Sequence, residues 1–126
     1  MKCRIILELL AILFFTGCYN REQISRLDEA EALIQNKPDS ALTILQQLKS
    51  EGSQAEQARY ALLYSEALDK NHIKATNDSL IRRAWEYYKH HPKDLRRQCK
   101  TLYYWGRVKL RAGDKPGALR LFLEIE

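Results

Sequence analysis

The residues of this chain that could do chemistry are its cysteines and histidines. His90 and His91 are adjacent, and neighbours on a helix point about 100° apart, so their rings cannot share a metal ion. They precede a proline, where a helix ends and positive charge is favoured. Cys99 lies on an apolar stretch, where a buried thiol is the usual outcome, and a nucleophilic cysteine would need a histidine partner in a cleft. Because no acidic pair stands out either, we expect no enzyme, no metal and no cofactor.

Cys18 has the most specific surroundings of the three cysteines. Residues 1–17 begin with a short positive segment and continue as an eleven-residue apolar run, Ile5 to Phe15, interrupted once by Glu8. Such a run is too short to span a bilayer but fits the central part of a signal peptide. It ends in Phe15-Thr16-Gly17-Cys18, which resembles a bacterial lipobox. The resemblance implies that Cys18 is lipidated and becomes the new N-terminus.

Two interpretations of this segment remain open. If the chain is a lipoprotein, residues 1–17 are its signal peptide and residues 18–22 a short polar tether. The alternative is a buried N-terminal helix in which Cys18 is an ordinary core cysteine. If Cys18 is acylated and Cys3 removed, Cys99 remains alone, so the mature chain forms no internal disulfide.

The rest of the chain has the pattern of an all-α protein. Only three prolines and five glycines occur among 126 residues, of which 45% are apolar and 29% charged. Apolar residues recur at helical spacing before Pro38, and Asp39 or Ser40 is expected to cap the next helix. A second helical pair is expected from Gln54, its second helix capped by Asn77 or Asp78. The third pair is hinged at Gly113-Asp114.

The second helices of these pairs resemble one another. Asp39-Ser40-Ala41-Leu42 recurs as Asp78-Ser79-Leu80-Ile81 and as Pro116-Gly117-Ala118-Leu119, at intervals of 39 and 38 residues. A period of this size predicts an α-solenoid, in which each hairpin covers its apolar face with its neighbours. The alternative is a plain helical bundle with coincidental spacing.

The third pair carries a more specific pattern. Leu102, Trp105 and Gly106 match the first helix of the tetratricopeptide repeat (TPR), and Ala118 and Phe122 match its second. The small residues, Gly106 and Ala118, would let the two backbones cross closely. The match is partial, because the family's tyrosine is replaced by Lys109. Over most of residues 24–126 the chain resembles TPR lipoproteins of the Bacteroidetes.

This resemblance implies a domain organisation and a location. Residues 23–126 form a TPR-like repeat domain of about three hairpins. That domain is expected to be incomplete at its C-terminus, since a solenoid normally ends in a polar capping helix. The lipid at Cys18 would hold the domain on a membrane of the cell envelope, facing the periplasm.

Charge is distributed unevenly along the chain. Residues 18–81 carry seven Lys or Arg and ten Asp or Glu, whereas residues 82–126 carry twelve and five, a net charge of +7. Basic residues mixed with aromatic ones can mark a nucleic-acid-binding surface, or form a solvated surface over an aromatic core. Because a lipoprotein lies outside the cytoplasm, we expect no nucleic acid, and an acidic protein or peptide suits this surface better.

The predicted function is therefore a non-enzymatic scaffold that binds a protein or peptide partner. TPR proteins usually bind in a groove lined by their first helices. In the third repeat the positions flanking the packed face are Lys100, Tyr103 and Arg107, which we predict to contact the partner. One alternative is the extracytoplasmic sensor part of a transmembrane transcriptional regulator, and a more distant one is a nucleic-acid-binding helical module.

Overall fold

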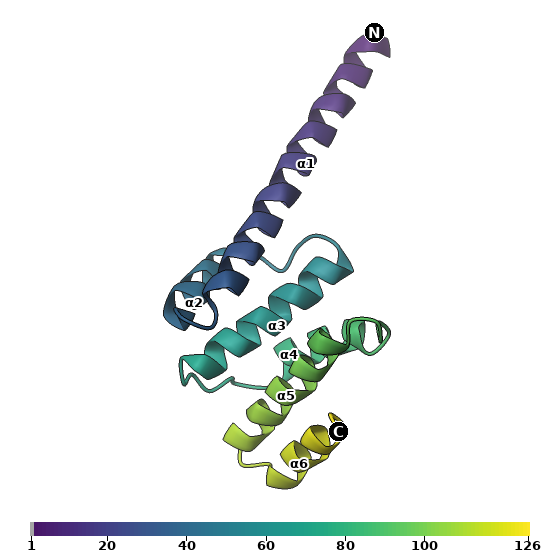
Figure 1. The fold of residues 1–126 in the computed structure, drawn as a ribbon. Coiled ribbons are helices and arrows are strands. Elements are labelled where there is room, and N and C mark those ends of the chain that lie inside the picture. Colours follow the sequence, from purple (N-terminus) through teal and green to yellow (C-terminus); the bar gives the residue numbers. More distant parts are fainter. Residues whose placement is uncertain (1) are drawn as a thin grey trace.

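A computed structural model describes the backbone of residues 2–126 and the side chains of residues 3–10 and 21–126. This part of the chain is all-helical and contains no strand, which confirms the predicted class (Figure 1). The helices are α1 (Lys2–Leu33), α2 (Pro38–Gln47), α3 (Gln54–Lys70), α4 (Ser79–Tyr88), α5 (Leu95–Arg111) and α6 (Lys115–Leu123).

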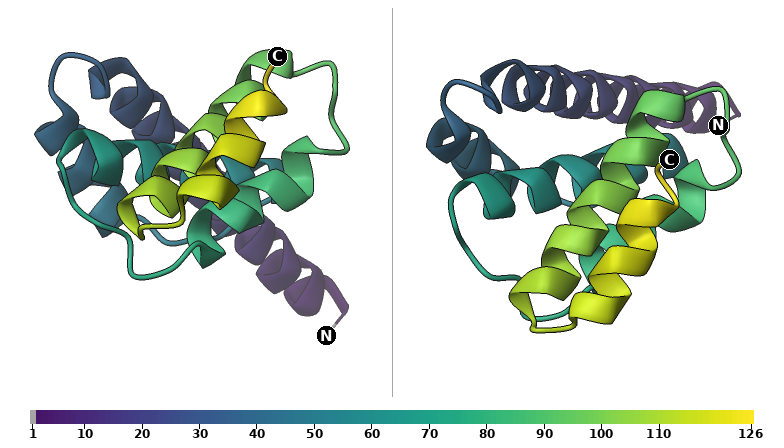
Figure 2. Two further views of the ribbon diagram at one scale, coloured as in Figure 1. Left: turned by 90° about the horizontal axis from the view of Figure 1, so that it is seen from below. Right: turned by 60° about the horizontal axis from the view of Figure 1, so that its bottom comes forward.

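The six helices form three hairpins, α1/α2, α3/α4 and α5/α6, as Figures 1 and 2 show. The second helix of one hairpin packs on the first helix of the next, because α2 contacts α3 and α4 contacts α5. The first helices are also neighbours, since α3 contacts both α1 and α5. One face of the molecule is therefore built from α1, α3 and α5.

Helix α1 is longer than the sequence pattern predicted. Its backbone is continuous from Lys2 to Leu33, through the expected signal peptide (1–17) and tether (18–22). Figure 1 shows its N-terminal half extending beyond the rest of the molecule, and the apolar side chains of Ile5, Leu7 and Leu9 are exposed there. Taken over the described residues, neither α1 nor any other helix combines the length and apolar character that a membrane crossing requires.

Two apolar clusters hold the hairpins together, and α3 contributes to both. The first joins α1, α2 and α3 around Leu27, Leu45 and Leu63. The second joins α3, α4 and α5 around Leu62 and Ile81. Helix α3 is therefore buried on two sides, because it lies between the first hairpin and α4 and α5.

Short polar side chains begin most of the helices. Ser53, Asp94 and Asp114 accept a hydrogen bond from the backbone N–H three residues ahead. Asn77 accepts one from the N–H of Ser79 at 2.9 Å. Each of these bonds satisfies an amide that the helix leaves free.

The prediction that Asp39 or Ser40 caps α2 is wrong. The helix begins at Pro38, and the residue before it, Lys37, makes no side-chain capping bond. Proline is favoured in the first helical turn, because its missing N–H would have no partner there and its fixed φ suits the helix. Pro38 therefore starts α2, while α1 has already ended at Leu33.

The hinge of the third hairpin is confirmed. Gly113 has φ +86°, and the N–H of Asp114 bonds to the carbonyl of Lys109 at 2.9 Å. This is the left-handed helix ending for which glycine is preferred. Helix α3 ends in the same way, because the N–H of Ile73 bonds to the carbonyl of Leu68 at 2.9 Å. There the left-handed position is occupied by His72, with φ 59°.

Candidate functional site

The face formed by α1, α3 and α5 carries ion pairs that link one hairpin to the next; we call it the charged face. Arg59 of α3 bonds to Asp28 of α1 at 2.7 Å and also to Glu31. Arg97 of α5 reaches the same Glu31 at 3.5 Å and Asp94 at 3.0 Å. Burial tends to lower the pKa of Arg59, but the bonds to the two carboxylates outweigh it and raise that pKa. Both guanidinium groups therefore stay charged and hold the three helices together.

A buried carboxylate lies at the centre of the charged face. Glu66 of α3 has no exposed surface, and its Oε2 lies 2.9 Å from Nζ of Lys100 on α5. Gln35 donates to its other oxygen at 3.2 Å, whereas Oε2 makes no well-aligned hydrogen bond. Burial, and then the charge of Glu66, raise the pKa of Tyr104, so this tyrosine stays neutral. The Lys100 ammonium therefore balances the charge of a carboxylate that water does not reach.

A third group of charges joins the far ends of α3 and α5. Asp69 accepts hydrogen bonds from Nε of Arg107 at 3.2 Å and from Nε of Arg111 at 2.8 Å. Arg111 also donates to the backbone carbonyl of Asp69 at 3.2 Å. Because two arginines share this carboxylate, either can be lost without leaving Asp69 unpaired.

The three residues predicted to contact a partner all lie on α5 but face different neighbours. Lys100 and Arg107 point toward α3, where Glu66 and Asp69 hold them. Tyr103 is 45% exposed, and its ring centroid lies 5.9 Å from that of Phe122 on α6. The structure therefore brings Lys100 and Arg107 onto the charged face and places Tyr103 at its α6 edge.

A small cavity opens in the charged face among the three helices. Its volume is about 40 Å³, room for roughly one water-sized polar group. Its lining residues are Glu31, Arg59, Leu62, Leu63, Glu66, Arg96, Arg97 and Lys100. The four basic residues outnumber the two acidic ones, and Arg96 is exposed with no ion pair among the described residues. The cavity can therefore accept one oxygen of a carboxylate, with Arg96 at its edge as the donor that is not already engaged.

Sequence reasoning missed Arg59, Glu66 and Arg96. Arg96 lies one helical turn before Lys100, so extending the predicted stripe upstream would have found it. Arg59 and Glu66 lie on α3, where the sequence register is ambiguous. No local pattern marks their pairing with residues on neighbouring hairpins.

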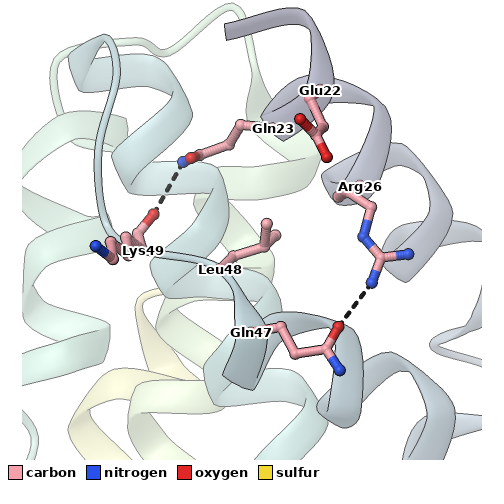
Figure 3. Close-up of a pocket in the computed structure, with 6 residues that line it drawn as sticks. All are labelled: Glu22, Gln23, Arg26, Gln47, Leu48 and Lys49. Carbon is pink, nitrogen blue, oxygen red and sulfur yellow. Dashed lines mark hydrogen bonds between the residues drawn. The ribbon is translucent and has the colours of Figure 1, made fainter. Parts of the chain in front are cut away.

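A larger and more open hollow, of about 440 Å³, lies between α1 and the end of α2 (Figure 3). Gln23 is buried there and donates to the backbone carbonyls of Lys49 and Glu51, both at 2.9 Å. Arg26 donates to Oε1 of Gln47 at 2.9 Å. The figure shows these polar side chains bridging the two helices. The hydrogen bonds of Gln23 therefore fix α1 to the linker between α2 and α3.

The histidines and cysteines considered for catalysis or metal binding do not form a common site among the described side chains. Among the described side chains, no three His, Cys, Asp or Glu residues are grouped so that they could hold a metal ion. His91 stacks on Tyr87, with ring centroids 3.8 Å apart, and His90 is exposed. Cys99 is a half-buried free thiol. Cys18, the predicted lipidation site, lies on α1, but its side chain is outside the described residues.

No protein-family model, curated protein or solved structure matches this chain. The likeness to tetratricopeptide repeats therefore stays a prediction, carried by the residues of the third hairpin and by the spacing of the second helices.

Proposed function

We propose that this protein is a membrane-anchored, TPR-like scaffold whose charged face binds an acidic protein or peptide partner. It does no chemistry of its own. A lipid on Cys18 holds it in the cell envelope, facing the periplasm. The charged face formed by α1, α3 and α5, with its basic cavity, is the observation that carries this proposal.

The stacking of the hairpins supports a TPR-like solenoid. Each second helix packs on the first helix that follows it, and the first helices stand side by side. In a plain bundle all helices would share one core, whereas here two clusters follow one another along the chain. Gly106 packs against Phe122, and Ala118 is buried, as the TPR pattern requires.

The electrostatics of the cavity support an acidic partner. Arg59 and Arg97 are fixed by carboxylates on α1, and Lys100 is fixed by Glu66. Side chains that are already positioned lose little conformational entropy when a ligand arrives. Arg96 supplies the free charge, Arg107 lies further along the same face, and Tyr103 offers a flat amphipathic surface at its edge.

The lipid anchor is supported by the sequence around Cys18 and by the position of Gln23. This buried glutamine bonds to the α2–α3 linker and lies five residues after Cys18. A domain that begins at Gln23 therefore leaves only a short segment between the lipid and the first hairpin. The exposed apolar side chains near the N-terminus fit a segment that enters a membrane during export.

The experiment is a binding titration of the full chain with a fluorescent acidic peptide that has a free C-terminal carboxylate. Charge-assisted hydrogen bonds contribute about 1.5–3 kcal/mol each, so Arg96→Ala and Arg107→Ala should each weaken binding by roughly tenfold or more. Arg107→Ala leaves Asp69 paired with Arg111, so its effect is not confused with unfolding. Tyr103→Ala tests whether the peptide also contacts the α6 edge of the charged face.

The matched control is Arg120→Ala, an exposed arginine on α6, a helix that is not part of the charged face. The proposal requires this variant to bind like the wild type. Equal affinities for all the variants would place the peptide elsewhere and reject the charged face as its site.

A further inference from the structure

Two linkers, α2–α3 and α4–α5, lie on the side of the hairpin stack toward which α1 extends. Gln23 ties the start of the packed part of α1 to the α2–α3 linker, residues 48–53. Arg83 of α4 donates to Oγ of Ser50 in the same linker at 3.0 Å. The α4–α5 linker, residues 89–94, follows at the end of α4. In Figure 1 both linkers lie to the upper right of the body, and the other turns lie toward the lower left.

The α4–α5 linker is exposed and basic. Its first five residues, Lys89-His90-His91-Pro92-Lys93, include two lysines and no acidic residue, and all five are exposed. The acidic side chains nearby are engaged, since Glu86 pairs with Lys89 and Asp94 pairs with Arg97. Lys93 makes no ion pair among the described residues.

An apolar side chain stands beside these charges. Leu95 is 62% exposed, more than most large apolar residues of the packed domain. Basic side chains next to an exposed leucine are typical of protein surfaces that lie on anionic membranes, where the leucine enters the headgroup region. We call Lys89, Lys93 and Leu95 the linker patch.

The proposed lipid anchor would hold this end of the domain close to a membrane. Gln23 lies five residues after Cys18, a separation of about 17 Å at most when the segment is fully extended and about 8 Å when it is helical. Charges within roughly 8–10 Å of a membrane surface feel its potential at physiological salt. The anchor therefore brings a membrane to the side of the domain on which the linker patch also lies.

We propose that the linker patch rests on anionic phospholipid headgroups and so fixes the orientation of the anchored domain. This proposal rests on the proposed lipid anchor at Cys18. Lys93 interacts with a lipid phosphate, Lys89 does so by exchanging its pair with Glu86, and Leu95 dips between the headgroups. With the lipid at Cys18 as the first contact and the linker patch as the second, the domain has one fixed orientation on the membrane.

The experiment uses the full-length, acylated chain reconstituted into vesicles, with an environment-sensitive fluorophore on Leu95→Cys. The background carries Cys3→Ser and Cys99→Ser, and acylation blocks Cys18. The matched control places the fluorophore on Ile73→Cys, which is 44% exposed in the α3–α4 loop at the opposite end. Each labelled chain is compared in neutral phosphatidylcholine vesicles and in vesicles that contain phosphatidylglycerol, with a spin-labelled lipid as the quencher.

The fluorophore at position 95 should be quenched in the anionic vesicles and much less in the neutral ones, whereas the fluorophore at position 73 should respond in neither. Each lysine near an anionic surface favours contact by about fivefold. Lys89→Glu with Lys93→Glu should therefore abolish the quenching, and high salt should weaken it.

Two failures are distinguished in the same sample by labelled palmitate. A chain that carries palmitate but shows equal quenching at position 95 in both kinds of vesicle overturns the linker patch and leaves the anchor intact. A chain without palmitate overturns the anchor, and with it this proposal.

Discussion

Gly106 on α5 and Phe122 on α6 meet so closely that the glycine has no room for a side chain. A Cβ atom on Gly106 would lie 2.8 Å from both Cδ1 and Cζ of the Phe122 ring. Real Cβ atoms essentially never approach other atoms this closely, so any larger residue must displace the Phe122 ring or push the two helices apart. The crossing of the third hairpin depends on this pair.

Replacing Gly106 by alanine should therefore destabilise the protein, although alanine is the better helix former. The clash is expected to cost about 1–3 kcal/mol, against a gain of about 1 kcal/mol in helix propensity. Urea unfolding of Gly106→Ala should give a lower midpoint than the wild type. In a Phe122→Ala background the clash is gone, so the same substitution should become neutral or stabilising. A destabilisation of equal size in both backgrounds would show that Phe122 is not the cause.

The third hairpin was the part of the fold most open to prediction from sequence. Its signals are local: Gly113 and Asp114 mark the hinge, and Gly106 and Ala118 are small residues at helical positions that must cross. Pro38 was less informative, since proline both follows helix ends and begins new helices. In the structure, Pro38 is the first residue of α2.

The charged face could be predicted only in part. The sequence places Lys100 and Arg107 on one stripe of α5, but their partners Glu66 and Asp69 lie 34 and 38 residues earlier. No local spacing reports such a pairing. Some of the basic residues in the second half of the chain therefore form ion pairs with acidic residues of the first half.

The pair of Lys100 and Glu66 should matter for stability. Lys100→Met leaves the buried Glu66 carboxylate without its counter-ion, which should cost about 2 kcal/mol or more. Glu66→Gln in the same chain removes the unpaired charge and should restore most of the loss. Urea unfolding of both single variants and the double variant measures the coupling. Additive effects would mean that the two side chains act independently.

His72 offers a test of the helix ending in α3. It holds a left-handed backbone conformation with φ 59°, which side chains disfavour and glycine tolerates. His72→Gly should relieve this strain and raise the unfolding free energy by about 0.5–1 kcal/mol. The extra conformational entropy of glycine in the unfolded chain offsets part of this gain. Gly113→Ala, at the equivalent position of α5, should lower it by about 1 kcal/mol. Thermal melts of both variants should therefore move in opposite directions, and a shift in the same direction would argue against this reading of the two turns.

Tyr88 should make the fold sensitive to alkali. This tyrosine is 2% exposed, and burial raises its pKa from 10.0 to about 12. Because the folded state favours the neutral phenol, this contribution to stability is complete below pH 10 and is lost as the pH rises toward 12. The unfolding free energy should fall over that interval, and less steeply in Tyr88→Phe. An identical pH profile for both proteins would mean that Tyr88 titrates normally.

The proposed lipid anchor at Cys18 predicts a specific labelling result. Phe15-Thr16-Gly17-Cys18 resembles a lipobox, so labelled palmitate should enter the wild-type chain in a bacterial host and should not enter Cys18→Ala. The same variant should leave the membrane fraction or remain unprocessed. Equal labelling of the two chains, or release of soluble wild type into the periplasm, would reject the anchor.

The central claim is that the charged face binds an acidic partner, and an NMR titration with the acidic peptide tests it most directly. Amide signals of α1 after Gln23, of α3 and of α5 should shift together as the peptide is added, with the largest changes around Arg96 and Lys100. Signals of α2, α4 and α6 should move little, because those helices lie behind this face. Shifts confined to α2, α4 and α6, or no shifts at all at high peptide concentration, would contradict the account.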